Sequence, residues 1–408
     1  MNKPAFRAHR VGPRTEAEML AFQHELDALR DDVNSRLGEV DARYVKTVLW
    51  IARGLESAGR ALLILGGGFW PTWGVGTVLL MLSHLIETME LGHNIMHGQF
   101  NFMKDPRFEG KRYRWSFACL PEDWHEFHNH VHHHYANVVG RDRDFTYGGM
   151  LRMSADTPWL PVHLIQWLLV PMAACLFEWG IALHNLEQEN EKRWNDPVTA
   201  KARWDRLWPR TRARLLFVAR REYVLWPLLG GAVGGSWALL AGEPVGAAAL
   251  SGWQAVLLGN VVAGVLRSFW AYWVIACGHF STDIHAFDEA DLKGESKGHW
   301  YLRQILSAGN FEGSVVLDVI SGNASHQIEH HIYPDMPSNR YAEISPKVQA
   351  ICGRYGVPYN TGSLPKQAAQ VAWRIVRHSF PGGARNVIRL GPVLAQASPD
   401  SVDQPRAA

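Results

Sequence analysis

Long apolar blocks alternate along the chain with polar stretches, and two of the blocks stand out. Residues 222–242 and 252–278 are mostly apolar, and a short link that contains Glu243 and Pro244 connects them. One bilayer crossing takes about 20 apolar residues, so each block is long enough for a transmembrane helix. The pattern predicts a helical hairpin in a membrane, whose second helix ends at His279.

A third apolar stretch covers residues 61–91 and is interrupted by glycines at 66–68 and by Pro71. It is ample for one crossing and short for two. If the N-terminal segment and His93 lie on the same side of the membrane, another span must begin near Val45. That earlier span would carry three charged residues whose helical spacing lets them pair with one another: Arg53, Glu56 and Arg60.

The N-terminal segment has the pattern of an amphipathic surface helix. Thr15 and Glu18 have the spacing of a capping box. The apolar positions that follow are separated by three or four residues: Met19, Phe22, Leu26, Leu29, Val33, Leu37 and Val40. We expect residues 1–44 to form a cytoplasmic helix that docks on the polar part of the protein.

The segment between the third apolar stretch and the hairpin is harder to place. Residues 157–186 are apolar but contain three prolines, and residues 187–221 hold ten Lys and Arg against five acidic residues. The positive-inside rule predicts that 187–221 is a cytoplasmic loop. Because the polar segment before residue 157 is also expected to be cytoplasmic, 157–186 should cross the membrane an even number of times. Thirty residues are too few for two crossings, so the segment is expected to lie along the interface.

Composition agrees with a membrane body that carries a polar cap. Hydrophobic residues make up 47% of the chain and 18 residues are Trp, while the net charge of +2 is too small to indicate nucleic-acid binding. The four cysteines are scattered without a CxxC motif, so no disulfide framework is expected. We predict an all-α integral membrane protein with about four transmembrane helices, an interfacial helix and a cytoplasmic helical cap within residues 45–380. A disordered tail is expected at residues 381–408.

Histidine is concentrated beside the ends of the apolar blocks. Six of the ten residues at 125–134 are histidines, a density that packing does not require. Neutral imidazole is the commonest protein ligand for transition metals. Three pairs have the i, i+4 spacing that places both side chains on one face of a helix: His93/His97, His128/His132 and His326/His330.

Eight positions are the best-spaced candidate ligands and catalytic residues: His93, His97, His128, His132, His133, His279, His330 and His331. One zinc ion takes three or four protein ligands, so this number suggests two metals. Two neighbouring irons with mostly nitrogen ligands can bind and split O2, a redox role that zinc cannot fill. The HxxEH pattern of His326 to His330 also matches inverted zinc peptidases, but that interpretation leaves the other clusters unexplained.

The remaining histidines fall into two sets. Four lie beside better-spaced ligands and are candidates to orient them through hydrogen bonds: His125, His130, His134 and His326. The others are expected to be ordinary polar residues: His9, His24, His84, His163, His184, His285, His299 and His378.

Three segments resemble, in order, the histidine boxes of the membrane fatty acid desaturases: residues 92–98, 128–137 and 327–334. The likeness runs from about residue 15 to about residue 375 and is greatest to bacterial acyl-CoA Δ9 desaturases. The third box has Gln327 where many relatives have histidine, and the family pattern suggests that Gln327 or His326 completes one metal site. The chain lacks the His-Pro-Gly-Gly motif of the cytochrome b5 domain that is fused to many front-end desaturases.

The resemblance implies a diiron centre that uses O2 to remove two hydrogens from a long acyl chain, expected to be an acyl-CoA attacked at Δ9. It also implies a bacterial inner-membrane location with the active site on the cytoplasmic face. Two electrons would come from an NADPH-dependent flavin and iron–sulfur oxidoreductase or a ferredoxin. A hydroxylase, a ketolase or an alkene-forming decarboxylase on the same scaffold remains an alternative. A membrane metal carrier is another, although it should have polar ligands inside its spans, and here the histidine lies only at the exit.

Overall fold

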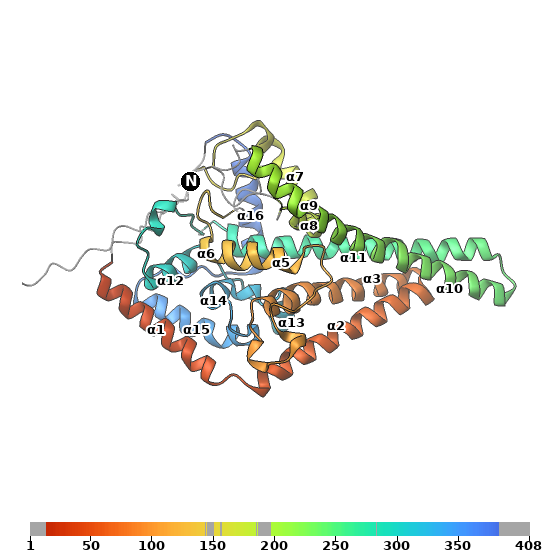
Figure 1. Cartoon of the computed structure of the whole chain (residues 1–408), viewed down its shortest axis with the longest axis horizontal. Helices are drawn as coiled ribbons and strands as arrows, with labels where there is room; N and C mark the ends of the chain where they lie inside the picture. Colours follow the sequence, from red (N-terminus) through yellow and green to blue (C-terminus); the bar gives the residue numbers. More distant parts are fainter. Residues whose placement is uncertain are drawn as a thin grey trace, which may run out of the picture.

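A computed structural model describes residues 14–382, apart from residues 143, 145–150, 156, 185, 187–196 and 283. Within this part every secondary-structure element is a helix, and β pairing is limited to two isolated bridges. Figure 1 shows a narrow bundle that projects from a wider body. The bundle contains α2 (Glu39–Gly66), α3 (Trp70–Leu85), α10 (Trp226–Ala241) and α11 (Val245–Phe280).

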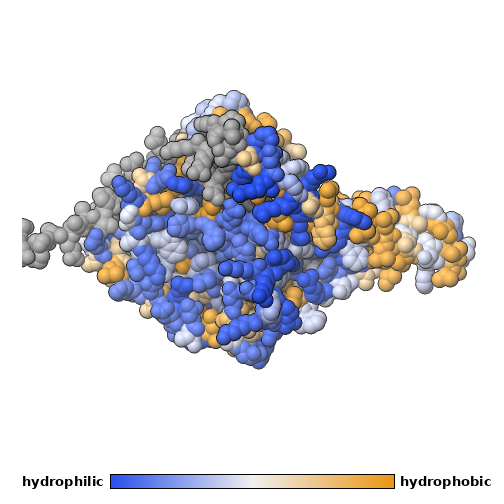
Figure 2. All heavy atoms as spheres, in the orientation of Figure 1, coloured by the Kyte–Doolittle hydropathy of each residue, from blue (hydrophilic) through white to orange (hydrophobic). Residues whose placement is uncertain are grey.

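The wider body is built from helices of many lengths and from 3₁₀ turns. Its helices are α1 (Glu16–Ser35), α4 (Asn94–Met96), α5 (Pro121–Trp124), α6 (His133–Tyr135), α7 (Gln166–Cys175), α8 (Phe177–His184), α9 (Pro197–Arg220), α12 (Lys297–Leu306), α13 (Val315–Ile320), α14 (Gln327–Ile332), α15 (Tyr341–Arg354) and α16 (Leu364–His378). Three further segments are π-helical: η1 (Ile86–His93), η4 (His125–His132) and η8 (Arg221–Leu225). Apolar side chains cover much of the projecting end, whereas the wider body is largely polar (Figure 2).

Three helical stretches in the described part are long and apolar enough to cross a membrane: Trp70–Met96, Lys201–Ala241 and Val245–Phe280. A fourth crossing is possible if Pro161–Cys175 and Phe177–His184, which meet at a bend of 98°, form one broken span. The predicted hairpin is present as α10 and α11, which pack closely because Gly230 and Gly252 face each other. A Cβ at Gly252 would lie 2.4 Å from the carbonyl oxygen of Gly230.

The prediction of a single N-terminal helix through Val40 is wrong. The Thr15 and Glu18 capping box is present, but α1 ends at Ser35, and Val40 belongs to α2, where its side chain is 67% exposed. Asp41 accepts a hydrogen bond from the backbone N–H of Gly38, which begins the second helix. The apolar spacing therefore continues across a break that the pattern alone does not reveal.

The charged residues of α2 pair as expected. The carboxylate of Glu56 forms ion pairs with the guanidinium groups of Arg53 and Arg60, with N–O distances of 3.3 and 3.2 Å. However, α2 is absent from the stretches that are apolar enough to cross a membrane. The predicted boundary after residue 44 falls inside this helix, and the predicted tail at 381–408 lies almost wholly outside the described residues. The division of the chain into three segments stays a prediction.

The prediction of a basic loop over residues 187–221 is also wrong for the part that the structure describes. Residues 197–220 form α9, which runs through η8 into α10 without a break. Charged residues favour water around a helix and apolar residues favour lipid, but Arg, Lys, Ala and Leu all have high helix propensity. The change from polar to apolar sequence at residue 222 therefore marks no end of the helix.

Candidate metal centre

Four separate parts of the fold bring the candidate ligands together. The end of η1 and the short α4 that follows it present His93 and His97, η4 and the start of α6 present His128, His132 and His133, the end of α11 presents His279, and α14 presents His330 and His331. Two of these segments are π-helical, a geometry that often marks functional sites. All eight predicted histidines lie in two adjoining groups.

The first group holds five histidines and the second holds three. The members of the first are His93, His97, His128, His133 and His330, and those of the second are His132, His279 and His331. In each group the candidate ligand atoms all lie within 4.8 Å of one another. The rings of His133 and His331 stack with centroids 4.5 Å apart, so the two groups are in contact.

His128 and His132 share one helix face, as their spacing predicts, and their rings stack with centroids 5.2 Å apart, but they belong to different groups. The Nε2 atom of His128 lies 3.3 Å from that of His133, five residues on, whereas His132 belongs to the other group. In a π-helix the backbone hydrogen bonds run from i to i+5, so residues four apart and residues five apart both lie near the same side. The segment from His128 to His133 therefore supplies three closely spaced histidines to two groups.

The spacing of the nitrogens suits metal ions. The Nε2 atoms of His93 and His128 are 3.0 Å apart, and those of His279 and His331 are 3.3 Å apart. Two nitrogens about 2.1 Å from one ion and at right angles lie about 3.0 Å apart. The Nε2 atoms of His97 and His330 are buried and have no hydrogen-bond partner among the described residues. The donor set thus fits two transition-metal ions.

Burial keeps most of these imidazoles in the metal-binding form. It lowers the pKa of His97, His128, His133, His330 and His331 well below the usual value. A neutral imidazole offers a free lone pair, so no proton competes for the ligand atom near neutral pH. His132 differs: burial alone would lower its pKa, but the carboxylates of Asp142 and Asp144 outweigh burial and raise the pKa to about 9.

Hydrogen bonds to residues outside the histidine clusters orient the rings. The Nδ1 atom of His132 lies 3.1 Å from a carboxylate oxygen of Asp142, and that of His331 lies 2.9 Å from the amide oxygen of Gln304. The Nδ1 atom of His330 lies 3.3 Å from the hydroxyl of Tyr341. A partner at Nδ1 turns Nε2 toward the centre and makes the ring a stronger ligand.

These partners were not identified from the sequence, and neither was His184. Its Nε2 atom lies 3.2 Å from Asp144, whose other carboxylate oxygen lies 3.5 Å from His132. The one available signal was the acidic residues of the Arg-Asp-Arg-Asp run, which begins nine residues after His132. His184 was expected to be an ordinary polar residue, whereas the structure connects it to the centre through Asp144.

The third box places Gln327, and not His326, beside the second group. The side-chain Nε2 of Gln327 lies 3.0 Å from the Nε2 of His279, while the Nδ1 of His326 lies 2.8 Å from the hydroxyl of Ser345. The i, i+4 pair His326/His330 is therefore split, because His326 precedes α14 in a 3₁₀ turn. Gln327 is the better placed of the two to add a fourth ligand to the smaller group.

Several other histidines lie apart from the two groups. His125 contacts the carbonyl oxygen of Gly110 at 3.0 Å, and His130 is exposed. The side chain of His24 is exposed on α1, and His84 is buried in α3. His9 lies outside the described residues.

A hollow lined mostly by apolar side chains opens beside both groups. Its volume is about 670 Å³, counting the part that is open to solvent. Four candidate ligands face it: His93, His128, His132 and His279. Aromatic rings form much of its wall, and they are in sequential contact, from His128 through Trp124 and Trp115 to Phe117. An extended apolar molecule in this hollow would pass directly beside the metal-binding nitrogens.

Comparison with known proteins places this geometry in a family. The model of the fatty acid desaturase family matches residues 68–363. A protein from two strains of Mycobacterium tuberculosis, named NADPH-dependent stearoyl-CoA 9-desaturase, is 38% identical over 373 residues, which cover 90% of this chain and 81% of that protein. The sn-1 linoleoyl-lipid 6-desaturase of Synechocystis is 23% identical over 81% of this chain. No solved structure matches.

The match spans the whole candidate centre. Residues 68–363 include every histidine of both groups, together with the aromatic wall of the hollow. The family model and the mycobacterial relative therefore agree with the architecture that the residues build. The chain belongs to the fatty acid desaturase family.

Proposed function

We infer that the protein is a membrane-bound acyl-CoA desaturase, an oxygen-dependent oxidoreductase of lipid metabolism. The observation that carries this conclusion is the apolar hollow that runs beside two groups of metal-binding histidines. A relative 38% identical over 90% of the chain bears the name stearoyl-CoA 9-desaturase. The family, the hollow and the donor set agree on one chemistry.

The finer proposal is that the enzyme introduces a cis Δ9 double bond into a long saturated acyl-CoA at a diiron centre. The five-histidine group would hold one iron, and the three-histidine group with Gln327 would hold the other. Two irons held there would supply the O2 activation that an unactivated carbon needs. The protein itself positions the acyl chain between Trp124, Phe127 and Phe177 and keeps bulk water from the reacting carbons.

Product analysis tests this function. The chain is expressed together with a candidate NADPH-dependent reductase in a host that lacks Δ9 activity, and fatty acids are profiled by mass spectrometry. We expect a monounsaturated fatty acid with the double bond at carbon 9. A hydroxylated acid, a keto acid or a terminal alkene would instead assign the scaffold to the alternative chemistry, because the same oxidant can transfer oxygen or fragment the chain.

We also propose that the histidine centre and α9 lie on the cytoplasmic side of the bacterial inner membrane. Exposed basic side chains of α9, which include Arg206 and Arg212, favour this orientation. Cysteines introduced at Arg212 and at Arg141 are expected to react with a membrane-impermeant reagent only after the cytoplasmic face is opened. If the two positions react from opposite sides, α9 and the centre lie on different faces and the proposed orientation is wrong.

A further inference from the structure

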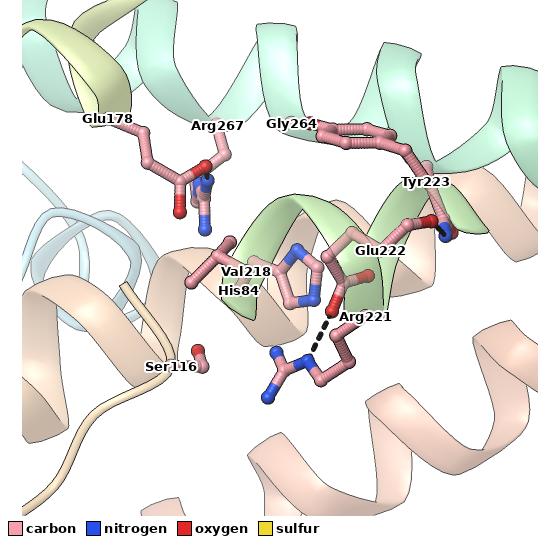
Figure 3. Close-up of a pocket in the computed structure, with 10 residues that line it drawn as sticks. His84, Ser116, Glu178, Val218, Arg221, Glu222, Tyr223, Gly264 and Arg267 are labelled. Atoms are coloured by element: carbon pink, nitrogen blue, oxygen red, sulfur yellow. Dashed lines mark hydrogen bonds and ion pairs between the residues drawn. The ribbon is translucent and has the colours of Figure 1, made fainter. Parts of the chain in front are cut away.

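A second cavity, the polar cavity, lies among the helices of the bundle, near the hollow (Figure 3). Its volume is about 290 Å³, counting the part that is open to solvent. In contrast to the hollow, polar and charged side chains dominate its lining, chiefly His84, Ser116, Glu178, Glu222, Asn260 and Arg267. None of these residues belongs to the two histidine groups.

The charges around the polar cavity are paired across helices. Arg267 of α11 pairs with Glu178 of α8. The carboxylate of Glu222 in η8 pairs with Arg60 of α2 at 3.0 Å. It also accepts a hydrogen bond from Arg221, the preceding residue, at 2.7 Å. Ionisable groups are costly at membrane depth, and where they occur they often mark ion or proton pathways.

Several polar atoms in the polar cavity have no hydrogen-bond partner among the described residues. They are both ring nitrogens of His84, the side-chain oxygen of Asn260 and the Nε of Arg267. His84 is only 6% exposed, and Figure 3 shows its ring directed toward Glu222 and Arg221. Buried polar atoms are normally satisfied by protein or by ordered water. With several free partners, the polar cavity is suited to hold about one ordered water molecule.

Only a thin wall separates the polar cavity from the hollow. Ser116 lines the polar cavity, and its chain neighbours Trp115 and Phe117 line the hollow. One helical turn after His84, Thr88 lines the hollow, about 6 Å further along the helix axis. The hydroxyl of Thr88 is buried and also has no partner among the described residues. His84 and Thr88 thus place polar groups of one helix on the two sides of this wall.

The proposed reaction needs such a connection. One O2, two hydrogens of the acyl chain, two electrons from the donor protein and two protons from solvent yield one double bond and two waters. The hollow is lined mostly by apolar side chains, so a polar route through its wall would let protons reach the centre and water leave it. We propose that the polar cavity, His84 and Thr88 form this route, an inference that rests on the proposed desaturase function.

The residues along the route suit the task. Arg221 lines the polar cavity and its side chain is 31% exposed, which places this end of the cavity near the surface. An imidazole accepts a proton on one ring nitrogen and releases one from the other, so His84 can pass protons without moving. The hydroxyl of Thr88 both donates and accepts hydrogen bonds, and Thr88 lines the hollow together with His93.

The sharpest test removes one hydroxyl without changing side-chain shape. Thr88→Val should slow desaturation by about 10- to 100-fold, up to the lower end of what a positioned proton-transfer group contributes. It should also raise the amount of hydrogen peroxide released per double bond, because oxygen that lacks protons leaves partly reduced. The matched control is Thr77→Val on the same helix, where the hydroxyl donates to the carbonyl of Trp73 and lines neither cavity.

His84 provides a second test with a chemical rescue. His84→Ala should show the same loss, and added imidazole should restore much of the activity by occupying the vacated space. A purely structural role for His84 would not respond to imidazole. Rescue supports the route, and loss of activity without rescue in a protein that keeps its iron assigns His84 to structure.

A third readout does not depend on turnover. An experimental structure at high resolution should show ordered water between His84 and Asn260, and a dry polar cavity would overturn the proposal. If the wild type forms no double bond with its donor, the proposed function itself fails. If the wild type and Thr77→Val form product normally and Thr88→Val matches them in rate and peroxide yield, only the proton route fails. Loss of iron by Thr88→Val would also overturn the route, because Thr88 would then support the centre.

Discussion

Replacing any one of eight histidines by alanine is expected to abolish double-bond formation: His93, His97, His128, His132, His133, His279, His330 and His331. The expected loss is at least about 1,000-fold, beyond the 10- to 100-fold that is typical when a ligand loses only its hydrogen-bond partner. All eight candidate ligand atoms lie in two compact groups, so each substitution opens the coordination shell of one ion. An ion that must cycle between oxidation states is then lost or misplaced.

Metal analysis should follow the same pattern. The purified wild type is expected to hold close to two irons per chain and little zinc, and each of the eight variants should hold less iron. Substitutions in the five-histidine group should remove one ion selectively, because His132, His279, His331 and Gln327 remain in the second group. Full activity with one metal, or with zinc, would contradict the diiron proposal.

Two alanine variants serve as matched controls. His130 lies in η4 between the candidate ligands His128 and His132, but its side chain is exposed, and His24 is exposed on α1. Both variants should keep wild-type product and iron. If two or more of the eight substitutions leave product at the wild-type level, the site has been assigned to the wrong residues.

Purified enzyme should form no double bond with NADPH and O2 until a separate electron-donor protein is added. Each turnover needs two external electrons, and the sequence contains no GxGxxG motif, no cysteine set for an iron–sulfur cluster and no His-Pro-Gly-Gly. The donor proposed is an NADPH-dependent flavin and iron–sulfur oxidoreductase or a ferredoxin. The printed name of the mycobacterial relative includes NADPH dependence. Turnover without any donor would reveal a redox centre within the chain.

The structure suggests where the donor docks. Arg210 of α9 pairs with Asp123, next to Trp124, and Arg214 donates to the carbonyl oxygens of Trp115 and Phe117 at 2.6 and 2.7 Å. The basic helix α9 thus packs on the segment that leads into the central box. A donor with an acidic surface, steered to α9 by its charge, would arrive close to the histidine groups.

Two measurements test this docking site. Activity should fall as salt rises from about 50 to about 300 mM, because exposed charge pairs are progressively screened. Reversing the exposed Arg212 of α9 to glutamate should lower kcat/KM for the donor roughly tenfold, mainly through slower association. The control reverses Arg377, which is exposed on α16. Equal losses for the two reversals, or no salt dependence, would place the donor elsewhere.

The sequence alone determined the chemistry and the membrane character of the protein. The eight histidines are recognisable because their number and clustering exceed what packing needs, and all eight meet in the structure. The hairpin α10 and α11 is recognisable because a membrane span must satisfy its backbone hydrogen bonds internally, which makes a long apolar block a direct sign of a helix. Both features are local, so they are visible along the chain.

Only the tertiary structure decided how those residues are shared between the two histidine groups. His128 lies in one group with His133, while His132, which shares a helix face with His128, belongs to the other group, and the spacing alone does not show this division. The choice of Gln327 over His326 likewise depends on where the 3₁₀ turn before α14 ends. A change from α-helix to π-helix or to a 3₁₀ turn is local in the backbone, but it is stabilised by the packing around it. No single residue type marks such a change in the sequence.

The hydrogen-bond partners of the histidine groups also could not be identified from the sequence. Gln304 orients His331 from 27 positions away, and Arg267 meets Glu178 across 89 positions to form one side of the polar cavity. A helical period shows which residues share a face of one helix, but it does not say which other helix that face will meet. Those contacts arise when separate helices pack, and for that reason the orienting hydrogen bonds and the proposed proton route became visible only in the folded molecule.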